Sequence, residues 1–404
     1  MNENENKKIK WFSIATIWFG GIVSVPALIV GSAVIQSLSF TTGLIASLIG
    51  FSFVVFYMIL LSIAAVNKQK ATVPLAASSF GHYGANIIVG LVIGLASIGW
   101  FAIQSNIAGA SFSKIVLDMS GVAIPAWISS VFWGIIMVLT AVFGFKYLKW
   151  LNYIAVPSII ALVIYALFIT FQDHSFQEIL DYKSEGEGGM SFMGVIGFAI
   201  GFISVGGVIS PDYNRFAATK KDAIIGSIMG IIPSAVALLA VGAILAITQG
   251  TYDIVEIFSS FGFPFFAMSI LILATWTTNV VNVYSAGLAF TKVFQLPEAN
   301  RSKVTLVVGL VAVVLAAGGL INHFQSFIQI LTVIVPPVAG VVISDYFIAK
   351  SYTDRSVDFN WKGIVAWAIG ALTIYFINHD LKYVYGILGA AVLYFIFQKI
   401  AVRK

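Results

Sequence analysis

Polar side chains that could hold a cation interrupt one apolar segment of the chain. Thr277, Thr278 and Asn279 are consecutive, and the residues around them are apolar. Hydroxyl and carbonyl oxygens without a carboxylate suit a monovalent cation such as Na⁺ better than a divalent one. Each Thr could instead bond the carbonyl one turn back in its own helix. The residue types alone therefore leave a cation site and a packing role open.

A second group of residues could recognise a planar ring. Trp100 and Gln104 are four residues apart, so they share one face of a helix. Trp offers a flat surface for stacking, Gln offers both a donor and an acceptor, and Phe202 could close a ring-sized slot. Other polar residues at similar depth are Ser204, Asn279 and Asn282. Ordinary helix packing could explain the aromatic residues, but the polar residues at a shared depth favour a small, planar, polar ligand.

Ionisable residues do not occur at the centre of any apolar segment. The four His residues fall at or near loops, and the chain has no Cys. The sequence therefore offers no acid/base pair, metal triad, nucleophile–base arrangement or disulfide within these segments. This composition counts against an enzyme, predicts no organic cofactor, and argues against a relay of protons.

The elements that carry these residues are membrane-spanning helices. The chain is 59% hydrophobic and 10% charged, against about 25% charged residues in a soluble domain. About 20 apolar residues cross the hydrocarbon of a bilayer, and the backbone needs internal hydrogen bonds there, which favours helices. Twelve spans are predicted at 11–36, 42–66, 84–117, 122–145, 151–171, 190–213, 223–248, 262–292, 304–322, 326–349, 361–378 and 383–402.

The basic residues predict how these spans are oriented. All Lys and Arg residues except Lys114, Lys183 and Lys382 fall in segments on one side of the predicted spans. Short basic loops stay in the cytoplasm, so both termini are expected to be cytoplasmic in a cell (inner) membrane protein. The net charge of +5 then reflects topology and contact with anionic lipid, not nucleic-acid binding. The first apolar run is too long for a cleaved signal peptide.

Glycine and proline interrupt two spans at matching places. The first span carries Gly20, Gly21, Ser24 and Pro26, and the sixth carries Gly201, Ser204, Gly206, Gly207, Ser210 and Pro211. Such pairs indicate broken helices in a transporter built from two inverted repeats, although Gly and Pro are also common in membrane helices for packing. The predicted division is a tail at 1–10, a five-helix repeat at 11–171, an extracellular linker at 172–189, a second repeat at 190–349 and two C-terminal helices at 350–404.

Four stretches of the sequence resemble the nucleobase–cation symporter-1 family, also called the purine-cytosine permease family. They are Gly99-Trp100-Phe101-Ala102-Ile103-Gln104; Gly201-Phe202-Ile203-Ser204 with Ser210-Pro211-Asp212-Tyr213-Asn214-Arg215-Phe216; Trp276-Thr277-Thr278-Asn279 with Ser285-Ala286-Gly287-Leu288; and Val335-Pro336-Pro337-Val338-Ala339-Gly340 with Asp345-Tyr346. The resemblance covers essentially the whole chain and is greatest to the cytosine-permease branch.

This resemblance implies a fold and a set of site residues. The family fold is an all-α, leucine-transporter-like repeat of five plus five helices, with broken helices 1 and 6 and two further C-terminal helices. The implied substrate site contains Trp100, Gln104, Gly201, Phe202, Ser204 and Asn279, to which the polar pattern adds Asn282. The implied Na⁺ ligands are the hydroxyls of Thr277 and Thr278 and the carbonyls of Gly20, Val23 and Ala274.

The expected function is import of a nucleobase-like heterocycle by cation symport through alternating access, with Na⁺ as the coupling ion in a monomeric transporter. Cytosine permeases carry a Gln where this chain has Ser97 and an acidic residue where it has Val280. These differences leave cytosine or another pyrimidine, a purine, a hydantoin and a vitamin precursor such as hydroxymethylpyrimidine open. A proton-coupled permease and a channel are the alternatives.

Overall fold

The computed structural model describes residues 8–143, 148–184, 186, 189–354 and 357–402, and these ranges are almost entirely helical. The first half contains α1 (Trp11–Ile22), α2 (Val25–Ile35), α3 (Phe40–Lys68), α4 (Thr72–Phe80), α5 (His82–Ser120), α6 (Ala126–Phe143), α7 (Leu148–Asp173) and α8 (Phe176–Asp181). The second half contains α9 (Phe192–Val208), α10 (Ser210–Asn214), α11 (Lys220–Gln249), α12 (Ile254–Ser259), α13 (Pro264–Val293), η3 (Glu298–Asn300), α14 (Arg301–Ala317), η4 (Leu320–His323), α15 (Phe324–Ile334), α16 (Pro336–Ile343), η5 (Ser344–Ile348), α17 (Trp361–Phe376) and α18 (Lys382–Val402).

Several predicted features lie outside the described residues. These are residues 1–7 of the predicted tail, the basic residues Lys146, Arg355, Arg403 and Lys404, and the linker residues Glu185 and Glu187.

The helices agree with the predicted spans. In the part of the chain that the structure describes, nine helices are long and apolar enough to cross a membrane, and the bent pair α1–α2 forms a tenth. The two other predicted spans correspond to α9 and α17, which are apolar but shorter. The short helices α4, α8 and α12 lie between the predicted spans. The all-helical membrane architecture is thus confirmed.

The first span is broken near its middle. Helices α1 and α2 meet at an angle of 65°, and the backbone of Ser24 between them is extended. Pro26 lies in the first turn of α2, where its missing N–H and fixed φ suit a helix start but not a helix interior. The break therefore occurs where Gly20, Gly21 and Pro26 predicted it.

The sixth span is interrupted further along than its glycines suggested. Residues 192–208 form the continuous helix α9, which includes Gly201 and Gly207, and Ile209 separates it from α10. Pro211 cannot donate to the carbonyl four residues earlier, which explains why α9 stops there. Glycine permits a break but does not require one.

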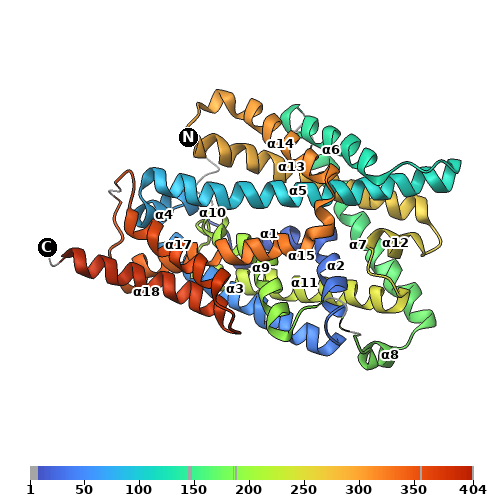
Figure 1. The fold of residues 1–404 in the computed structure, drawn as a ribbon, viewed down its shortest axis with the longest axis horizontal. Helices are drawn as coiled ribbons and strands as arrows, with labels where there is room; N and C mark the ends of the chain where they lie inside the picture. Colours follow the sequence, from blue (N-terminus) through green and yellow to red (C-terminus); the bar gives the residue numbers. More distant parts are fainter. Residues whose placement is uncertain (1–7, 144–147, 185, 187–188, 355–356, 403–404) are drawn as a thin grey trace.

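Most of the helices form two groups, one along the upper side of Figure 1 and one below it. The first group, named the bundle here, contains α1, α2, α3, α9, α10 and α11, and the second, named the scaffold, contains α5, α6, α13 and α14. Close backbone approaches hold the bundle together. A Cβ on Gly230 would lie 2.7 Å from the Ala15 carbonyl of α1, and a Cβ on Gly242 would lie 2.0 Å from the Leu28 carbonyl of α2. Small residues of this kind are typical of packed membrane helices.

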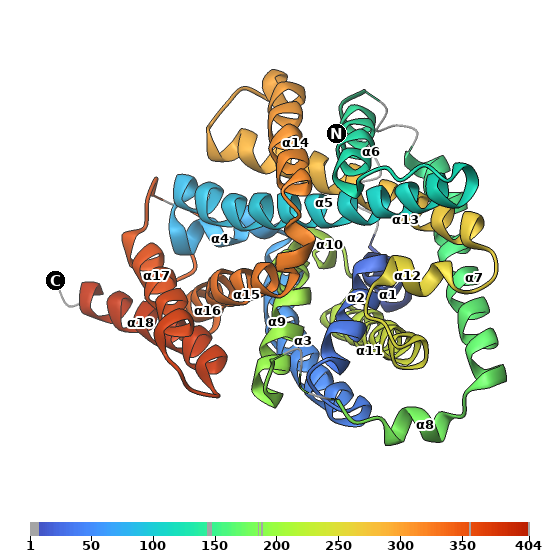
Figure 2. The ribbon, with the colours of Figure 1, turned by 45° about the vertical axis from the view of Figure 1, so that its right-hand side comes forward.

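The last helices connect the two groups and extend to one side. Helix α15 packs on α9 and on α5, and the chain is interrupted at Val335 before Pro336 and Pro337 begin α16. Helices α16, α17 and α18 pack together (Figure 2). The buried carboxylate of Asp345 accepts hydrogen bonds from Ser79 of α4 (3.2 Å) and Tyr394 of α18 (3.0 Å), so it ties this helix group to the rest of the molecule.

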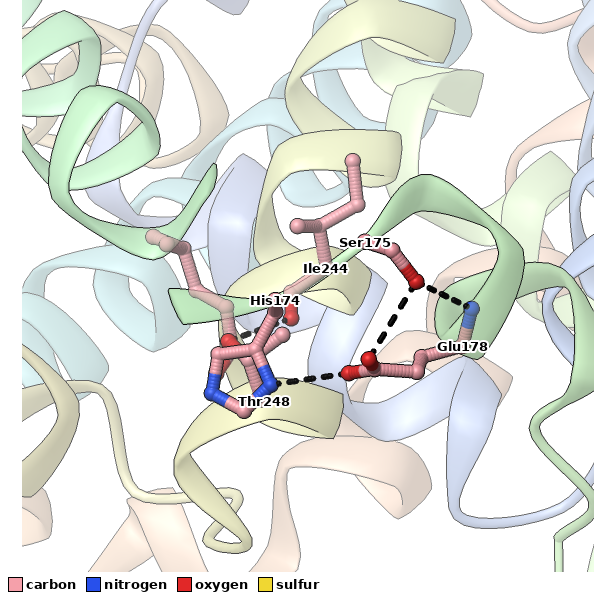
Figure 3. A network of polar contacts seen from close by, with 6 residues as sticks. His174, Ser175, Glu178, Ile244 and Thr248 are labelled. Carbon is pink, nitrogen blue, oxygen red and sulfur yellow. Dashed lines mark hydrogen bonds and ion pairs between the residues drawn. The ribbon is translucent and has the colours of Figure 1, made fainter. Parts of the chain in front are cut away.

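The predicted linker contains an ordered helix end. Ser175 caps α8 by accepting a hydrogen bond from the Glu178 backbone N–H (3.3 Å), and its hydroxyl and the His174 ring contact the Glu178 carboxylate (Figure 3). The hydrogen bond from His174, followed by that from the Ser175 backbone, lowers the pKa of Glu178. All of these groups stabilise α8 locally, and Thr248, also labelled in Figure 3, donates to the Ile244 carbonyl of its own helix (3.0 Å).

Candidate functional site

A cavity of about 310 Å³ lies between the bundle and the scaffold. Its lining residues are Ile17, Trp18, Gly21, Ile22, Ser24, Pro26, Trp100, Gln104, Phe202, Ile203, Val205, Gly206, Ile209, Tyr213, Ile231, Thr278 and Asn282. Five residues predicted as site residues meet here, from helices α5, α9 and α13: Trp100, Gln104, Phe202, Thr278 and Asn282. None of these lining residues is charged. A volume of about this size and a mixed aromatic and amide lining suit a small organic ligand.

Trp100 forms the aromatic centre of the cavity. Its ring meets Phe202 edge to face, with ring centroids 5.7 Å apart and planes at 79°. It also meets Phe324 (6.0 Å) and Phe327 (5.3 Å) of α15. The Phe327 ring lies directly against Gly99, where a Cβ would be 2.1 Å away. Trp100 is therefore held in place by three aromatic rings, and its contact with Phe202 is a T-shaped pair, not a parallel stack.

Four polar side chains of α5 and α13 contact one another in a row, a polar chain that runs from the cavity lining to the buried residue behind it. The Thr278 hydroxyl lies 2.5 Å from Oε1 of Gln104, and Nε2 of Gln104 lies 3.4 Å from Oδ1 of Asn279. The same Asn279 oxygen lies 3.5 Å from Nδ2 of Asn282. The last two distances are long for hydrogen bonds. Gln104 is 3% exposed and lines the cavity, and its Nε2 carries a second N–H besides the one directed at Asn279.

Three residues of the implied substrate site do not line the cavity. Asn279 is completely buried and donates to the Phe101 carbonyl (3.0 Å) behind the wall. Ser204 is also fully buried, and its hydroxyl bonds the Gly201 carbonyl (2.9 Å) of its own helix. A Cβ on Gly201 would lie 2.2 Å from the hydroxyl of Thr332, so this glycine faces α15. Their predicted contacts with a substrate stay predictions.

The implied cation ligands on α13 lie together. The carbonyl oxygen of Ala274 accepts from the hydroxyls of Thr277 (2.9 Å) and Thr278 (3.0 Å). Gly21 and Ser24, at the break of the first span, line the same cavity as Thr278, and the carbonyls of Gly20 and Val23 belong to this break. No group of three or more His, Cys, Asp or Glu side chains that could hold a metal was found among the described residues. The neutral oxygens on α13 fit a monovalent cation and not a tightly bound divalent one.

The residues that line one end of the cavity and connect the helices there were not predicted from the sequence. Trp18 of α1 lines the cavity beside Tyr213, with ring centroids 5.3 Å apart. The Trp18 indole N–H donates to Oδ1 of Asn214 (3.0 Å), and Nδ2 of Asn214 donates to Ser62 (2.7 Å) and Ser227 (2.9 Å). This buried amide thus joins α1, α3, α10 and α11. Tyr213 and Asn214 belong to a stretch that resembles the family, but nothing in the sequence indicated that they contact Trp18.

A second cavity of about 730 Å³ lies nearer the other end of the molecule, between α2, α5, α12 and η4. Asn106 of α5 lines it and donates to the Ala316 carbonyl (2.7 Å) and to Ser130 (3.2 Å). Its Oδ1 accepts from the backbone N–H of Ile321 (3.4 Å). Asn106 therefore holds the turn between α14 and α15.

The chain is similar to membrane permeases along most of its length. Residues 2–396 match the family described as permease for cytosine/purines, uracil, thiamine and allantoin. The hydantoin permease of Microbacterium maritypicum is 27% identical over 95% of this chain and 84% of its own length. The cytosine permease of Escherichia coli (strain K12) is 26% identical over 97% of this chain and 89% of its own length.

Two solved structures share the fold at low sequence identity. The inward-facing conformation of Mhp1 is 20% identical, with a TM-score of 0.86 over 100% of this chain and 94% of the other. Mhp1, a nucleobase-cation-symport-1 family transporter, in a closed conformation with bromovinylhydantoin bound, gives a TM-score of 0.80 over 100% and 96%, again at 20% identity. This likeness confirms the predicted fold.

Proposed function

The chain belongs to the family of permeases for cytosine/purines, uracil, thiamine and allantoin, and we propose that it imports a neutral, planar heterocycle together with Na⁺. As a family member with permease relatives it is a secondary transporter of the nucleobase type and not an enzyme. We further propose which rings it accepts, which ion drives the transport and how the helices move.

The observation that carries the proposal is the uncharged cavity in which Trp100 and Phe202 stand beside Gln104 and Asn282. An aromatic surface stacks a flat ring, and amides supply donors and acceptors for its polar edge. An ionised ring would enter this cavity without a counter-charge, which is costly in a buried site. This supports pyrimidines, purines, hydantoins or hydroxymethylpyrimidine in their neutral forms, and it argues against a permanently charged ring such as that of thiamine.

The cation that fits the α13 oxygens best is Na⁺. The Ala274 carbonyl with the Thr277 and Thr278 hydroxyls offers neutral oxygen ligands, and the cavity lining contains no carboxylate or imidazole to carry a proton. Carbonyls freed at a broken helix commonly complete such a site, which gives Gly20 and Val23 their proposed role. Each positive charge moved inward gains about 2.3 kcal/mol per 100 mV, equivalent to roughly a fifty-fold concentration ratio.

Alternating access fits the separation of the helices into bundle and scaffold. The cavity lies between the two groups, so a rotation of one group against the other would open it to either side of the membrane. The proposed orientation, with both termini in the cytoplasm of a cell membrane and the linker outside, follows from the basic loops. The division into two five-helix repeats and a monomeric state complete the proposal.

A binding screen tests this function directly. Purified full-length protein is heated with uracil, cytosine, hypoxanthine, hydantoin, allantoin and hydroxymethylpyrimidine, each with NaCl and with choline chloride at equal ionic strength. We expect at least one neutral ring to raise the melting temperature, because binding stabilises the folded state, and to raise it more in Na⁺. The absence of any shift with all six rings, in a protein that melts cooperatively, would contradict the proposal.

A further inference from the structure

The Thr278 hydroxyl takes part in both the predicted cation site and the polar chain of the cavity. Its oxygen lies 3.0 Å from the Ala274 carbonyl oxygen, 3.1 Å from that of Thr275 and 2.5 Å from Oε1 of Gln104. A hydroxyl carries one proton and can donate a strong hydrogen bond to only one of these acceptors. The direction of that proton therefore decides whether Thr278 holds Gln104.

The opposite end of the polar chain is fixed by two acceptors. Nδ2 of Asn279 lies 3.0 Å from the Phe101 carbonyl oxygen and 3.2 Å from the Met137 sulfur. Neither of these atoms can donate, so the NH₂ group of Asn279 must face them and its Oδ1 must face Gln104. Gln104 is then required to turn Nε2 toward Asn279 and Oε1 toward Thr278.

This order of amides gives the cavity a defined polarity. One N–H of Gln104 remains for the cavity after the other has turned to Asn279. Asn282 directs its Nδ2 to the same Asn279 oxygen, so its Oδ1 is left toward the cavity that it lines. A donor on Gln104 and an acceptor on Asn282, which line the same cavity, complement the amide or amidine edge of a neutral ring, where an acceptor atom stands next to an N–H.

We propose that Thr278 couples the cation to the ring by orienting Gln104, an inference that rests on the proposed function. A cation coordinated by the Ala274 carbonyl and the Thr278 oxygen repels the hydroxyl proton, which then donates to Oε1 of Gln104. The cation thereby holds Gln104 in the orientation that presents an N–H to the ring. Asn279 is a positioning residue that fixes the other end of Gln104 without touching the ring.

The proposed coupling links the affinity for Na⁺ to the affinity for the ring. If Na⁺ strengthens ring binding by some factor, the ring must strengthen Na⁺ binding by the same factor, because binding free energies are linked. A coupling of about 5- to 150-fold is typical of two linked sites. Thr277 provides a matched comparison, since its hydroxyl bonds the same Ala274 carbonyl but makes no contact with Gln104 among the described hydrogen bonds.

The experiment measures this coupling factor in the full-length protein. The dissociation constant of the best ring from the six-compound screen is determined by calorimetry in choline chloride and at saturating NaCl, and Na⁺ binding alone is followed by its effect on the melting temperature. We expect a coupling factor well above one in the wild type and in Thr278→Ser, and a factor of one in Thr278→Val. Thr277→Val should need more Na⁺ to saturate but should keep the wild-type factor.

A second variant separates lost coupling from a lost ion site or a poorly folded protein. Gln104→Met leaves the oxygens of α13 in place, so Na⁺ should still raise its melting temperature, whereas its weakened ring binding should no longer respond to Na⁺. A wild-type coupling factor in Gln104→Met or Thr278→Val, or its loss in Thr278→Ser, would overturn the inference and leave the proposed function standing. A wild-type protein that binds rings equally well without Na⁺ would overturn the inference as well as the choice of ion. A wild-type protein that binds none of the rings would overturn the proposed function itself.

Discussion

Replacing Trp100 with Ala should remove most of the affinity for the ring. Trp100 and Phe202 line the cavity beside each other, and Trp100 provides the larger face. Stacking of a base on an aromatic side chain contributes about 1–3 kcal/mol, so Trp100→Ala is expected to raise the dissociation constant about 5- to 150-fold. Trp100→Phe keeps a flat ring and should lose much less.

The substitution also weakens packing, and a second tryptophan controls for this effect. Trp100 has three aromatic neighbours, Phe202, Phe324 and Phe327, and truncating a packed Trp costs up to about 3–5 kcal/mol of stability. Trp133 of α6 also has three, because its ring meets Phe112 (5.8 Å), Phe132 (5.7 Å) and Trp276 (5.5 Å). Trp133 is not among the residues that line the cavity.

The assay compares the two variants at a temperature where both are folded. Calorimetric titration with the ring at saturating Na⁺ should show a large loss of affinity in Trp100→Ala and wild-type affinity in Trp133→Ala, although both melt earlier than the wild type. Equal affinities in the two variants would mean that the ring binds elsewhere, and the reasoning from the cavity would fail.

Three further predictions concern the ion site and the bundle. The double substitution Thr277→Ala and Thr278→Ala should abolish the difference between uptake in Na⁺ and in choline, and a remaining difference in radiolabelled uptake would refute the site. Asn214→Leu should destabilise the protein by about 1–3 kcal/mol and so lower its melting temperature, because the buried Trp18 indole N–H loses its acceptor and Ser62 and Ser227 each lose a donor; an unchanged melting temperature would exclude this role. Gly242→Val should lower the free energy of unfolding by about 1–3 kcal/mol or more, since its Cβ would lie 2.0 Å from the α2 backbone. Gly389→Val, with nothing within 4 Å of the added Cβ, should melt like the wild type. Similar melting temperatures of the two glycine variants would refute the close approach of α11 to α2.

The depth of the site residues could be predicted from the sequence, but their rotation could not. Position along a helix follows from the rise of 1.5 Å per residue, which is why Trp100, Gln104, Phe202, Thr278 and Asn282 were expected at one level and do meet in one cavity. Successive residues also turn by about 100° around the helix axis. Which of them faces the cavity then depends on how the neighbouring helices pack.

Asn279 illustrates this limit. It follows Thr278 directly, yet Thr278 lines the cavity and Asn279 is completely buried against α5. Ser204 is turned away in the same manner and bonds its own helix. The role of Asn214 was equally hidden, because it depends on partners 13 to 196 residues away in sequence. Contacts of this kind appear only once the helices are assembled.

The two interrupted spans differ in how well their breaks could be located. In the first span Gly20 and Gly21 precede Pro26 closely, and the break falls between them. In the sixth span the glycines remain within α9, and the helix ends only at Val208, before Pro211. Proline forbids a helical hydrogen bond, whereas glycine only lowers the cost of leaving the helix. Proline was therefore the better guide to the position of the break.

Uptake into liposomes tests most directly whether an ion gradient drives a ring through this cavity. The purified wild-type protein is reconstituted, and accumulation of the radiolabelled ring selected by the binding screen is followed with an inward Na⁺ gradient or with choline in its place. We predict saturable accumulation that requires Na⁺, increases with an inside-negative potential and is absent in Trp100→Ala. Equal uptake in choline, or equal uptake by Trp100→Ala, would contradict symport through the cavity between bundle and scaffold.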